Sequence, residues 1–321
     1  MTIQDRFKCT PEKMNERFSN DRLEDETDAS ELSAAVLELL RPAEQRGPVI
    51  FASPHSGRRY PASFLALSRL DRSELRQSED GYVDLLFDAA PRHGAPLLRA
   101  LFPRAYVDVN RARDEIDPRM FADPAPANID SRSNRVRVGL GVIPRIVADG
   151  HDIYARKLRY RDAEKRLRTC YDPYHAALGD LIDETRAAFG CAVLIDCHSM
   201  PSIGGAPFRP GEPPIDFVLG DRYGASCAGS LTALVEQVLA GMGYRVSRNS
   251  PYAGGHVAAA YGRPETGVHV LQIEINRALY LDEARLTRHR GFAALRRTIE
   301  ELVGALASVS PGALLPAQAA E

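Results

Sequence analysis

Two histidines near the ends of apolar runs are the residues of this sequence best suited to bind a metal ion. His55 follows the apolar residues of VIFASPHSG and His198 those of VLIDCHSM, and we expect each in a turn at a strand end. Two histidines and one carboxylate are a usual ligand set for catalytic zinc, with water in the fourth position. Because zinc lowers the pKa of that water to about 7 and polarises a carbonyl oxygen, the pair indicates metal-assisted hydrolysis.

Carboxylates supply the other parts of such a site. The third ligand is expected near the start of a helix, where RQSEDGYVDLLF offers both Glu79 and Asp80. Glu274, within the apolar run VLQIEIN, is the candidate general base, which takes a proton from water and delivers it to the leaving amine. Asp196 precedes His198 by two positions and points the same way along a strand, so we expect it to orient that histidine.

Cationic and amide side chains are candidates for holding a substrate and its oxyanion. The run AYVDVNRAR ends on Asp108, Asn110, Arg111 and Arg113, and two loops add Arg145 and, within the glycine-rich PYAGGHVAAAYGRP, His256 and Arg263. An arginine can stabilise an oxyanion, and arginines hold carboxylates through two parallel hydrogen bonds. The glycine-rich segment could be a flexible surface loop, and we favour its interpretation as a lid or clamp. We expect a substrate with one or two carboxylates.

Most of these residues also have a structural interpretation. A single histidine after a strand is more often a hydrogen-bonding residue than a ligand. Asp80 could be a helix N-cap, and Glu274 could form a buried ion pair with Arg277 or Arg111. Cys197 lies on the opposite strand face from its acidic and histidine neighbours, so we predict a buried, unreactive thiol.

Short apolar runs alternate with helical patterns, which favours an α/β fold with a mixed, mainly parallel sheet and helices on both faces. Strands are predicted over residues 48–53, 95–100, 104–110, 191–196, 214–221 and 268–276. Helical patterns cover residues 29–40, 81–94, 153–189 with a break before Pro173, 226–243 and 282–306. In open sheets of this class, ligands bind outside the carboxyl ends of the strands, where the candidate residues gather.

The composition narrows the class of protein. The 321 residues carry a net charge of −2, which suggests neither a nucleic-acid surface nor a membrane patch. Five cysteines without a CxxC pair argue against a disulfide framework or a cysteine zinc cluster. The N-terminus has no apolar signal segment and no run is long enough to cross a membrane, so we expect a cytoplasmic protein. Residues 1–45 are predicted to be a peripheral extension, 46–308 a single domain and 309–321 a flexible tail.

The chain resembles the N-formylglutamate amidohydrolase family over about residues 48–285, in the segments ASPHSGRRYP, SEDGYVDLLF, AYVDVNRARDEIDP, VLIDCHSMPS and GGHVAAAYGRPETGVHVLQIEINRALYLDE. That family is similar in fold to the zinc carboxypeptidases and other phosphorylase/hydrolase-like α/β proteins. The resemblance implies metal-assisted hydrolysis of an N-formyl or related N-acyl amide on an acidic amino acid. In one route of histidine degradation, this reaction releases glutamate and formate.

The resemblance also implies roles for particular residues. It puts one divalent ion, with zinc (Zn²⁺) the expected metal, on His55, Asp80 and His198, and the general base on Glu274. It places Asn110 and Arg111 near the substrate or the developing oxyanion, and the segment with His256 and Arg263 over the site. Asp108, Asp196 and Glu79 are expected to support the ligands without binding the metal.

One departure affects the third ligand. Zinc carboxypeptidases have a ligand glutamate three positions after the first histidine, and Arg58 stands there in this chain. The third ligand must therefore come from further along, where Glu79 competes with Asp80. Residues 120–145 match no motif of the family and are expected to shape specificity.

Three functional hypotheses follow. The first is a zinc-dependent amidohydrolase that cleaves N-formyl-L-glutamate. The second is an enzyme of the same kind acting on another N-acyl amino acid or a small acidic peptide. The third is a metal-free module that binds an acidic ligand through its arginines. All three predict a small-molecule partner, and the sequence leaves the oligomeric state open.

Overall fold

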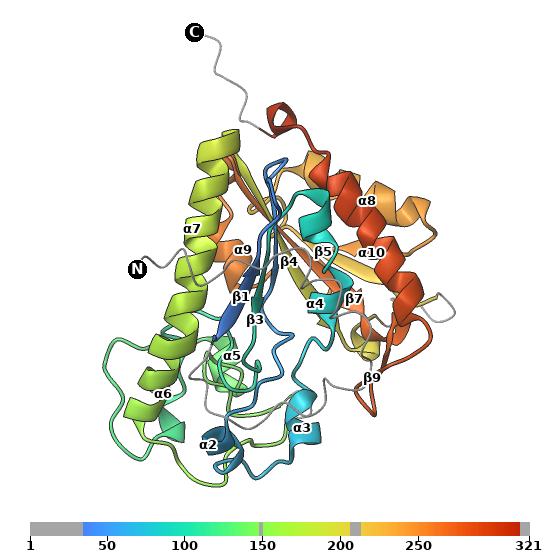
Figure 1. Ribbon diagram of the computed structural model, residues 1–321. Coiled ribbons are helices and arrows are strands. Elements are labelled where there is room, and N and C mark those ends of the chain that lie inside the picture. The colour runs from blue at the N-terminus through green and yellow to red at the C-terminus, as the bar shows by residue number, and fades with distance from the viewer. Residues whose placement is uncertain (1–34, 148–149, 206–212, 315–321) are drawn as a thin grey trace.

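A seven-stranded sheet forms the centre of the protein, with helices on both faces (Figure 1). The computed structural model describes residues 35–147, 150–205 and 213–314. The strand order is β1-β3-β2-β4-β7-β5-β6. The strands are β1 (Leu37–Leu40), β2 (Val49–Ser53), β3 (Leu97–Ala100), β4 (Ala192–Met200), β5 (Phe217–Gly220), β6 (Val246–Arg248) and β7 (Val268–Asn276), with a separate hairpin of β8 (Leu281–Asp282) and β9 (Thr287–Arg288).

The four central strands, β3, β2, β4 and β7, run parallel to one another. Toward the edges the direction changes, because β1 pairs antiparallel with β3 and β5 pairs antiparallel with β7. The outermost strand β6 is parallel to β5. The predicted mixed, mainly parallel sheet with helices on both faces is therefore confirmed.

Two apolar layers hold the helices against the sheet. One layer joins α6, α7 and α9 to one face, and the other joins α4, α8 and α10 to the opposite face (Figure 1). The α-helices are α2 (Ala62–Leu65), α3 (Arg72–Arg76), α4 (Val83–Leu86), α5 (Asn134–Arg137), α6 (Tyr160–Arg166), α7 (Asp172–Phe189), α8 (Gly229–Gly241), α9 (His256–Tyr261) and α10 (Phe292–Ala307). Short 3₁₀ turns are η2 (Ala90–His93), η3 (Pro118–Met120), η5 (Ser202–Gly205), η6 (Pro264–Thr266), η7 (Arg277–Leu279) and η8 (Pro311–Ala313).

The strands β4 and β7 change character halfway along one face. Toward α7 and α9 they present first Ala192, Leu194, Val268 and Val270, and then Asp196, His198, Gln272 and Glu274. The opposite face stays apolar from Val193 to Cys197 and from Leu271 to Ile275. Because side chains alternate along a strand, one face carries a core in its first half and polar groups in its second.

Two predicted elements have a different structure. Residues 104–110 form turns rather than a strand, since the N–H groups of Tyr106 and Val107 both donate to the Pro103 carbonyl. The alternating pattern there reflects burial of Val107 and Val109 in the core, without a partner strand. The helix predicted over residues 29–40 is also wrong in its described part, because Leu37–Leu40 pairs with the open side of β3.

Three helical predictions need smaller corrections. The pattern over residues 153–189 becomes helical only at Tyr160, and a π-helical turn, Leu167–Tyr171, carries the helix through the predicted break into α7. The segment 81–94 forms two short pieces, α4 and η2, and ends as predicted at Gly94. The closing helix begins at Phe292, because the residues before it form the β8–β9 hairpin.

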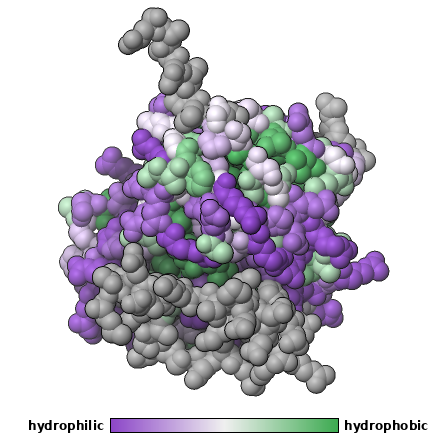
Figure 2. All heavy atoms as spheres, turned by 45° about the horizontal axis from the view of Figure 1, so that its top comes forward, coloured by the Kyte–Doolittle hydropathy of each residue, from purple (hydrophilic) through white to green (hydrophobic). Residues whose placement is uncertain are grey.

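Polar side chains cover most of the described surface in the view of Figure 2. Among the described residues, the exposed large apolar side chains are those of Val138, Ile203 and Tyr223. No helix within the described ranges has both the length and the apolar character that crossing a membrane requires. Residues 1–34 and 315–321 lie outside the described residues, so the division into extension, domain and tail stays a prediction.

The close approach of the segment after β2 to β3 should depend on Gly57. A Cβ atom there would lie 2.1 Å from the Phe102 carbonyl oxygen, and that oxygen belongs to the backbone. We expect Gly57→Ala to lower the free energy of unfolding by about 1–3 kcal/mol through overpacking. Gly179→Ala, in α7 with nothing within 4 Å, should raise it by about 0.5–1 kcal/mol. Urea unfolding of both variants at equal metal content tests the pair, and equal stabilities would contradict the expectation.

Candidate active site

His55 lies two residues beyond β2 and is fully buried. Its Nε2 lies 2.8 Å from Asp108 Oδ1, and its Nδ1 lies 3.3 Å from Asp80 Oδ2. Asp108 comes from the turns after β3 that were predicted as a strand. The carboxylate on Nε2 fixes the orientation of the ring and leaves Nδ1 directed at Asp80.

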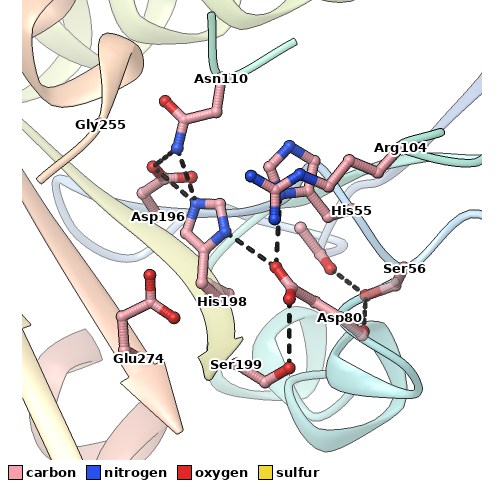
Figure 3. A network of polar contacts seen from close by, with 12 residues as sticks. His55, Ser56, Asp80, Arg104, Asn110, Asp196, His198, Ser199, Gly255 and Glu274 are labelled. Carbon is pink, nitrogen blue, oxygen red and sulfur yellow. Dashed lines mark hydrogen bonds and ion pairs between the residues drawn. The ribbon is translucent and has the colours of Figure 1, made fainter. Parts of the chain in front are cut away.

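His198 repeats this arrangement from the neighbouring strand. It lies within β4, so its predicted position in a turn beyond the strand is wrong. Its Nε2 lies 2.9 Å from Asp196 Oδ2, and its Nδ1 lies 2.9 Å from Asp80 Oδ2. The ring centroids of His55 and His198 are 4.9 Å apart. Each histidine therefore has one carboxylate behind it and shares Asp80 in front. Figure 3 shows Asp196 and Asp80 on either side of His198.

Asp80 is held between the two histidines by its backbone and by one carboxylate oxygen. Its N–H donates to the His55 carbonyl at 3.0 Å, while Oδ1 accepts from Ser199 Oγ and from Arg277 Nη2, both at 3.2 Å. Oδ2 is thus the oxygen directed at the imidazoles. Glu79 turns away, with its carboxylate on the Tyr60 hydroxyl and Arg76, so the structure brings Asp80 and not Glu79 to the histidines.

The three facing atoms form a site that favours a positive charge. If each Nε2–H donates to its own carboxylate, then His55 Nδ1, His198 Nδ1 and Asp80 Oδ2 turn lone pairs toward one another. Burial opposes charge on His198, but Asp196 and Asp80 outweigh it and raise the pKa of His198 well above its ordinary value. His55 Nδ1 is a buried atom without a hydrogen-bond partner in the described part of the chain.

These three residues fit a metal ion. One donor atom from each of His55, Asp80 and His198 lies within 4.8 Å of the others, and all three residues are buried. Two imidazole nitrogens and one carboxylate oxygen are a donor set that suits zinc and leaves a position open for a further ligand. A cation there would satisfy the unpartnered nitrogen of His55.

Glu274 lies beside this cluster on β7. It is the register partner of His198, and its carboxylate accepts a hydrogen bond from Gln272 Nε2 at 2.8 Å. Burial raises the pKa of Glu274 to about 7, so it can both take and return a proton near neutral pH. The alternative of a buried ion pair is not what the structure shows, because Arg277 contacts Asp80, and Arg111 lies near Asp108.

Asn110 links the cluster to the glycine-rich segment. Its Nδ2 donates to Asp196 Oδ2 at 3.3 Å, and its Oδ1 accepts from the N–H of Val257 at 2.8 Å. A Cβ on Gly255 would lie 2.5 Å from the Asn110 amide, so only glycine allows this approach. The segment around Gly255 therefore lies against Asn110, and its role as a lid or clamp stays a prediction.

The arginine facing the cluster was not among the sequence candidates. Arg104 donates from Nε to Asp108 Oδ2 at 2.9 Å, and its side chain reaches toward the centre of the cluster (Figure 3). Burial opposes its charge, but Asp108, Asp80 and Glu274 outweigh burial and raise the pKa of Arg104. Arg111, by contrast, donates from Nε and Nη1 to the carbonyls of Leu140 and Asn110.

Three residues predicted to bind substrate have their own contacts outside the His55, Asp80 and His198 cluster. Arg113 pairs with Asp172 and Glu164, and Arg145 pairs with Asp152 and Asp117. His256 lies 3.4 Å from the Tyr171 hydroxyl, in a group of aromatic rings on α7 and α9. Their positions in loops could not show, from the sequence alone, which residues these side chains would contact.

Arg263 is placed at the wrong end of the sheet for its predicted role. It forms a bridge with Val268 at the start of β7, and its Nη1 donates to the carbonyls of Ala259 and Gly262. Val268 precedes Glu274 by six positions, which corresponds to roughly 20 Å along a strand. The structure therefore does not bring Arg263 to the cluster.

Several residues near the site were not among the candidates predicted from the sequence. Ser199 and Gln272 lie next to assigned residues, and strand alternation could have identified Gln272 as a neighbour of Glu274 on the same face. Arg104 carried no such signal, because its segment was predicted as a strand. Tyr252 is half-buried, and burial followed by the charge of Glu274 raises its pKa.

Comparisons with known proteins show the family of the chain. A sequence profile described as N-formylglutamate amidohydrolase matches residues 47–281. N-formylglutamate deformylase of Pseudomonas aeruginosa is 32% identical over 268 residues, which cover 81% of this chain and 93% of that protein. The deformylase of Pseudomonas putida is 28% identical and covers 76% of this chain and 86% of that protein.

Solved structures of similar fold include a member of the same family. The crystal structure of N-formylglutamate amidohydrolase from Ralstonia eutropha JMP134 has a TM-score of 0.80 and 39% identity, covering 85% of this chain and 98% of that one. A gene product of Agrobacterium tumefaciens, with a TM-score of 0.56 and 21% identity, shares the fold. From the profile match and these relatives, the chain belongs to the N-formylglutamate amidohydrolase family.

Proposed function

We propose that this protein hydrolyses the formyl amide of N-formyl-L-glutamate to L-glutamate and formate. The observation that carries the proposal is the convergence of His55 Nδ1, His198 Nδ1 and Asp80 Oδ2 beside the buried carboxylate of Glu274. A divalent ion, with zinc the expected one, would be held by these three residues and would act as a Lewis acid that also lowers the pKa of water. The names of the relatives support the substrate.

Glu274 moves the proton in this proposal. As a carboxylate it removes a proton from the water molecule that attacks the formyl carbon, and it then delivers that proton to the departing amine of glutamate. Its pKa of about 7 suits both steps, because neither protonation state is strongly disfavoured near neutral pH. Asp108 and Asp196 keep the two imidazoles oriented during the reaction.

Arg104 is better placed than Arg111 to stabilise the oxyanion. The Nη groups of Arg104 have no hydrogen bond to another described residue, whereas Arg111 donates from two positions to backbone carbonyls. A cation aimed at developing charge acts strongly in a site from which water is partly excluded. Arg111 then supports Asp108, 3.6 Å from its Nη2, rather than the substrate.

The wider setting belongs to the same proposal. We place the enzyme in histidine degradation, as the family resemblance implies, and we keep the cytoplasm, expected from the sequence, as its location. Residues 120–145, which match no motif of the family, are proposed to determine substrate specificity. Metal-free binding of an acidic ligand is the weaker hypothesis, because it gives the buried histidines and Glu274 no task.

Removal of the metal should abolish activity. Chelator treatment is expected to stop formate release from N-formyl-L-glutamate, and added zinc should restore it. His198→Ala should lower the bound zinc measured by mass spectrometry, because one of three ligands is lost. His93→Ala, at a partly exposed histidine beside Glu300, serves as the matched control and should keep both zinc and activity. Full activity in chelated protein without detectable metal would contradict the proposal.

Loss of the general base should separate catalysis from metal binding. We expect Glu274→Gln to reduce kcat by roughly 10²–10⁴-fold while zinc content stays at the level of the unaltered enzyme. Glu236→Gln, which changes a surface carboxylate paired with Arg248, should leave kcat unchanged. Formate release under saturating substrate gives the comparison, and near-normal turnover in Glu274→Gln would show that the base is misassigned.

Removal of the Arg104 guanidinium should raise the free energy of the transition state. Arg104→Met is expected to lower kcat by roughly 10²–10³-fold, the usual effect of losing one oxyanion donor. Arg92→Met, at a surface arginine paired with Glu300, controls for the loss of a charge. Steady-state kinetics distinguish the roles, since a change confined to KM would assign Arg104 to a substrate carboxylate. An unchanged kcat/KM would exclude both roles.

A further inference from the structure

Gln272 connects the candidate base to the glycine-rich segment. It lies two residues before Glu274 on β7, so both side chains point to the same face, and both are buried. Its Nε2 donates to Glu274 Oε1 at 2.8 Å, and its Oε1 accepts from the N–H of Gly255 at 2.7 Å. The two ends of one amide thus join a strand residue to a loop residue.

The backbone decides which way this amide faces. The N–H of Gly255 can only donate, so the atom of Gln272 that meets it must be the carbonyl oxygen. The NH₂ group of Gln272 must then face Glu274, where it can only donate. The hydrogen bond therefore goes to a carboxylate oxygen and occupies Oε1, which leaves Oε2 as the oxygen without this contact.

We infer that Gln272 is a positioning residue, which holds the Glu274 carboxylate so that Oε2 is the atom that accepts the proton from water. The inference rests on the proposed function, in which Glu274 is the base. A glutamate side chain has three rotatable bonds, and fixing one of its oxygens removes most of the freedom of the other. Proton transfer needs the base within hydrogen-bond reach of water, so this restriction acts directly on the chemical step.

The segment around Gly255 is also connected, through Asn110, to Asp196, the carboxylate behind His198. Two residues after Gly255, the N–H of Val257 donates to Asn110, whose amide donates in turn to Asp196. Gly255 has no room for a side chain against Asn110. The segment is therefore fixed on Asn110, and Gln272 transmits that fixed position to Glu274.

Two substitutions of Gln272 distinguish positioning from a structural role. Gln272→Met keeps the length of the side chain and loses both hydrogen bonds, whereas Gln272→Glu keeps an acceptor for Gly255 and presents oxygen to Glu274. If positioning is the role, Gln272→Glu should reduce kcat at least as much as Gln272→Met, by roughly 10²-fold, with little change in KM. If the role is only structural, Gln272→Glu should be the milder change.

The control is the same substitution at a distant amide. Gln45 donates to the Gly47 carbonyl and to Thr185 Oγ1, outside the site, so Gln45→Met should leave kcat unchanged. All variants are compared at equal zinc content and after their urea midpoints have been measured. A fall in stability without a fall in kcat for both Gln272 variants would overturn the inference.

A double-mutant cycle with Glu274→Gln completes the test. Once the carboxylate is absent, Gln272→Met should add little further loss of kcat, because the two residues act as one unit. Additive losses would mean that Gln272 acts independently of Glu274 and would contradict the inference. Absence of formate release by the unaltered enzyme would instead contradict the proposed function, so the two failures are distinguishable.

Discussion

The parallel register of β4 and β7 is the constraint on which the site depends. Nine residue pairs align the two strands, which places Asp196 beside Gln272 and His198 beside Glu274. A shift of one position would turn every side chain of a strand to the other face and move the polar residues into the apolar layer below α8 and α10. The register is specified in the second halves of both strands, where one face is polar and the other apolar, so the core and the site depend on the same pairing.

Much of the fold could be predicted because its strongest signals are local. The apolar runs of β2, β4 and β7 and the helix α8 with its stop at Gly243 are continuous patterns, and each appears where the sequence indicates. The failures occurred where tertiary contacts override the pattern. Residues 104–110 alternate because Val107 and Val109 are buried, and β1 is a strand because β3 offers it an open edge.

The site was predictable to the extent that its residues come from strand ends. His55, His198 and Glu274 could be grouped by that rule, and the family resemblance favoured Asp80, which the structure brings to the histidines. The cationic residues could not be assigned in this way, because an arginine reaches far and its partner depends on the path of a loop. Arg113 and Arg145 bind nearby acidic residues, while Arg104, which carried no motif, reaches the cluster.

The two margins of the sheet have a consequence for association between molecules. An unpaired strand edge offers N–H and carbonyl groups that can template pairing with another chain. Here β1 covers the open side of β3, although it precedes the family-matched residues, and the other margin is the three-residue β6, which ends on an ion pair between Arg248 and Glu236. A short, charged strand is a poor template for edge-to-edge aggregation. On its side β1 becomes the margin in place of β3, and as a strand of four residues it leaves a short edge, so the residues before the family-matched region contribute to colloidal stability.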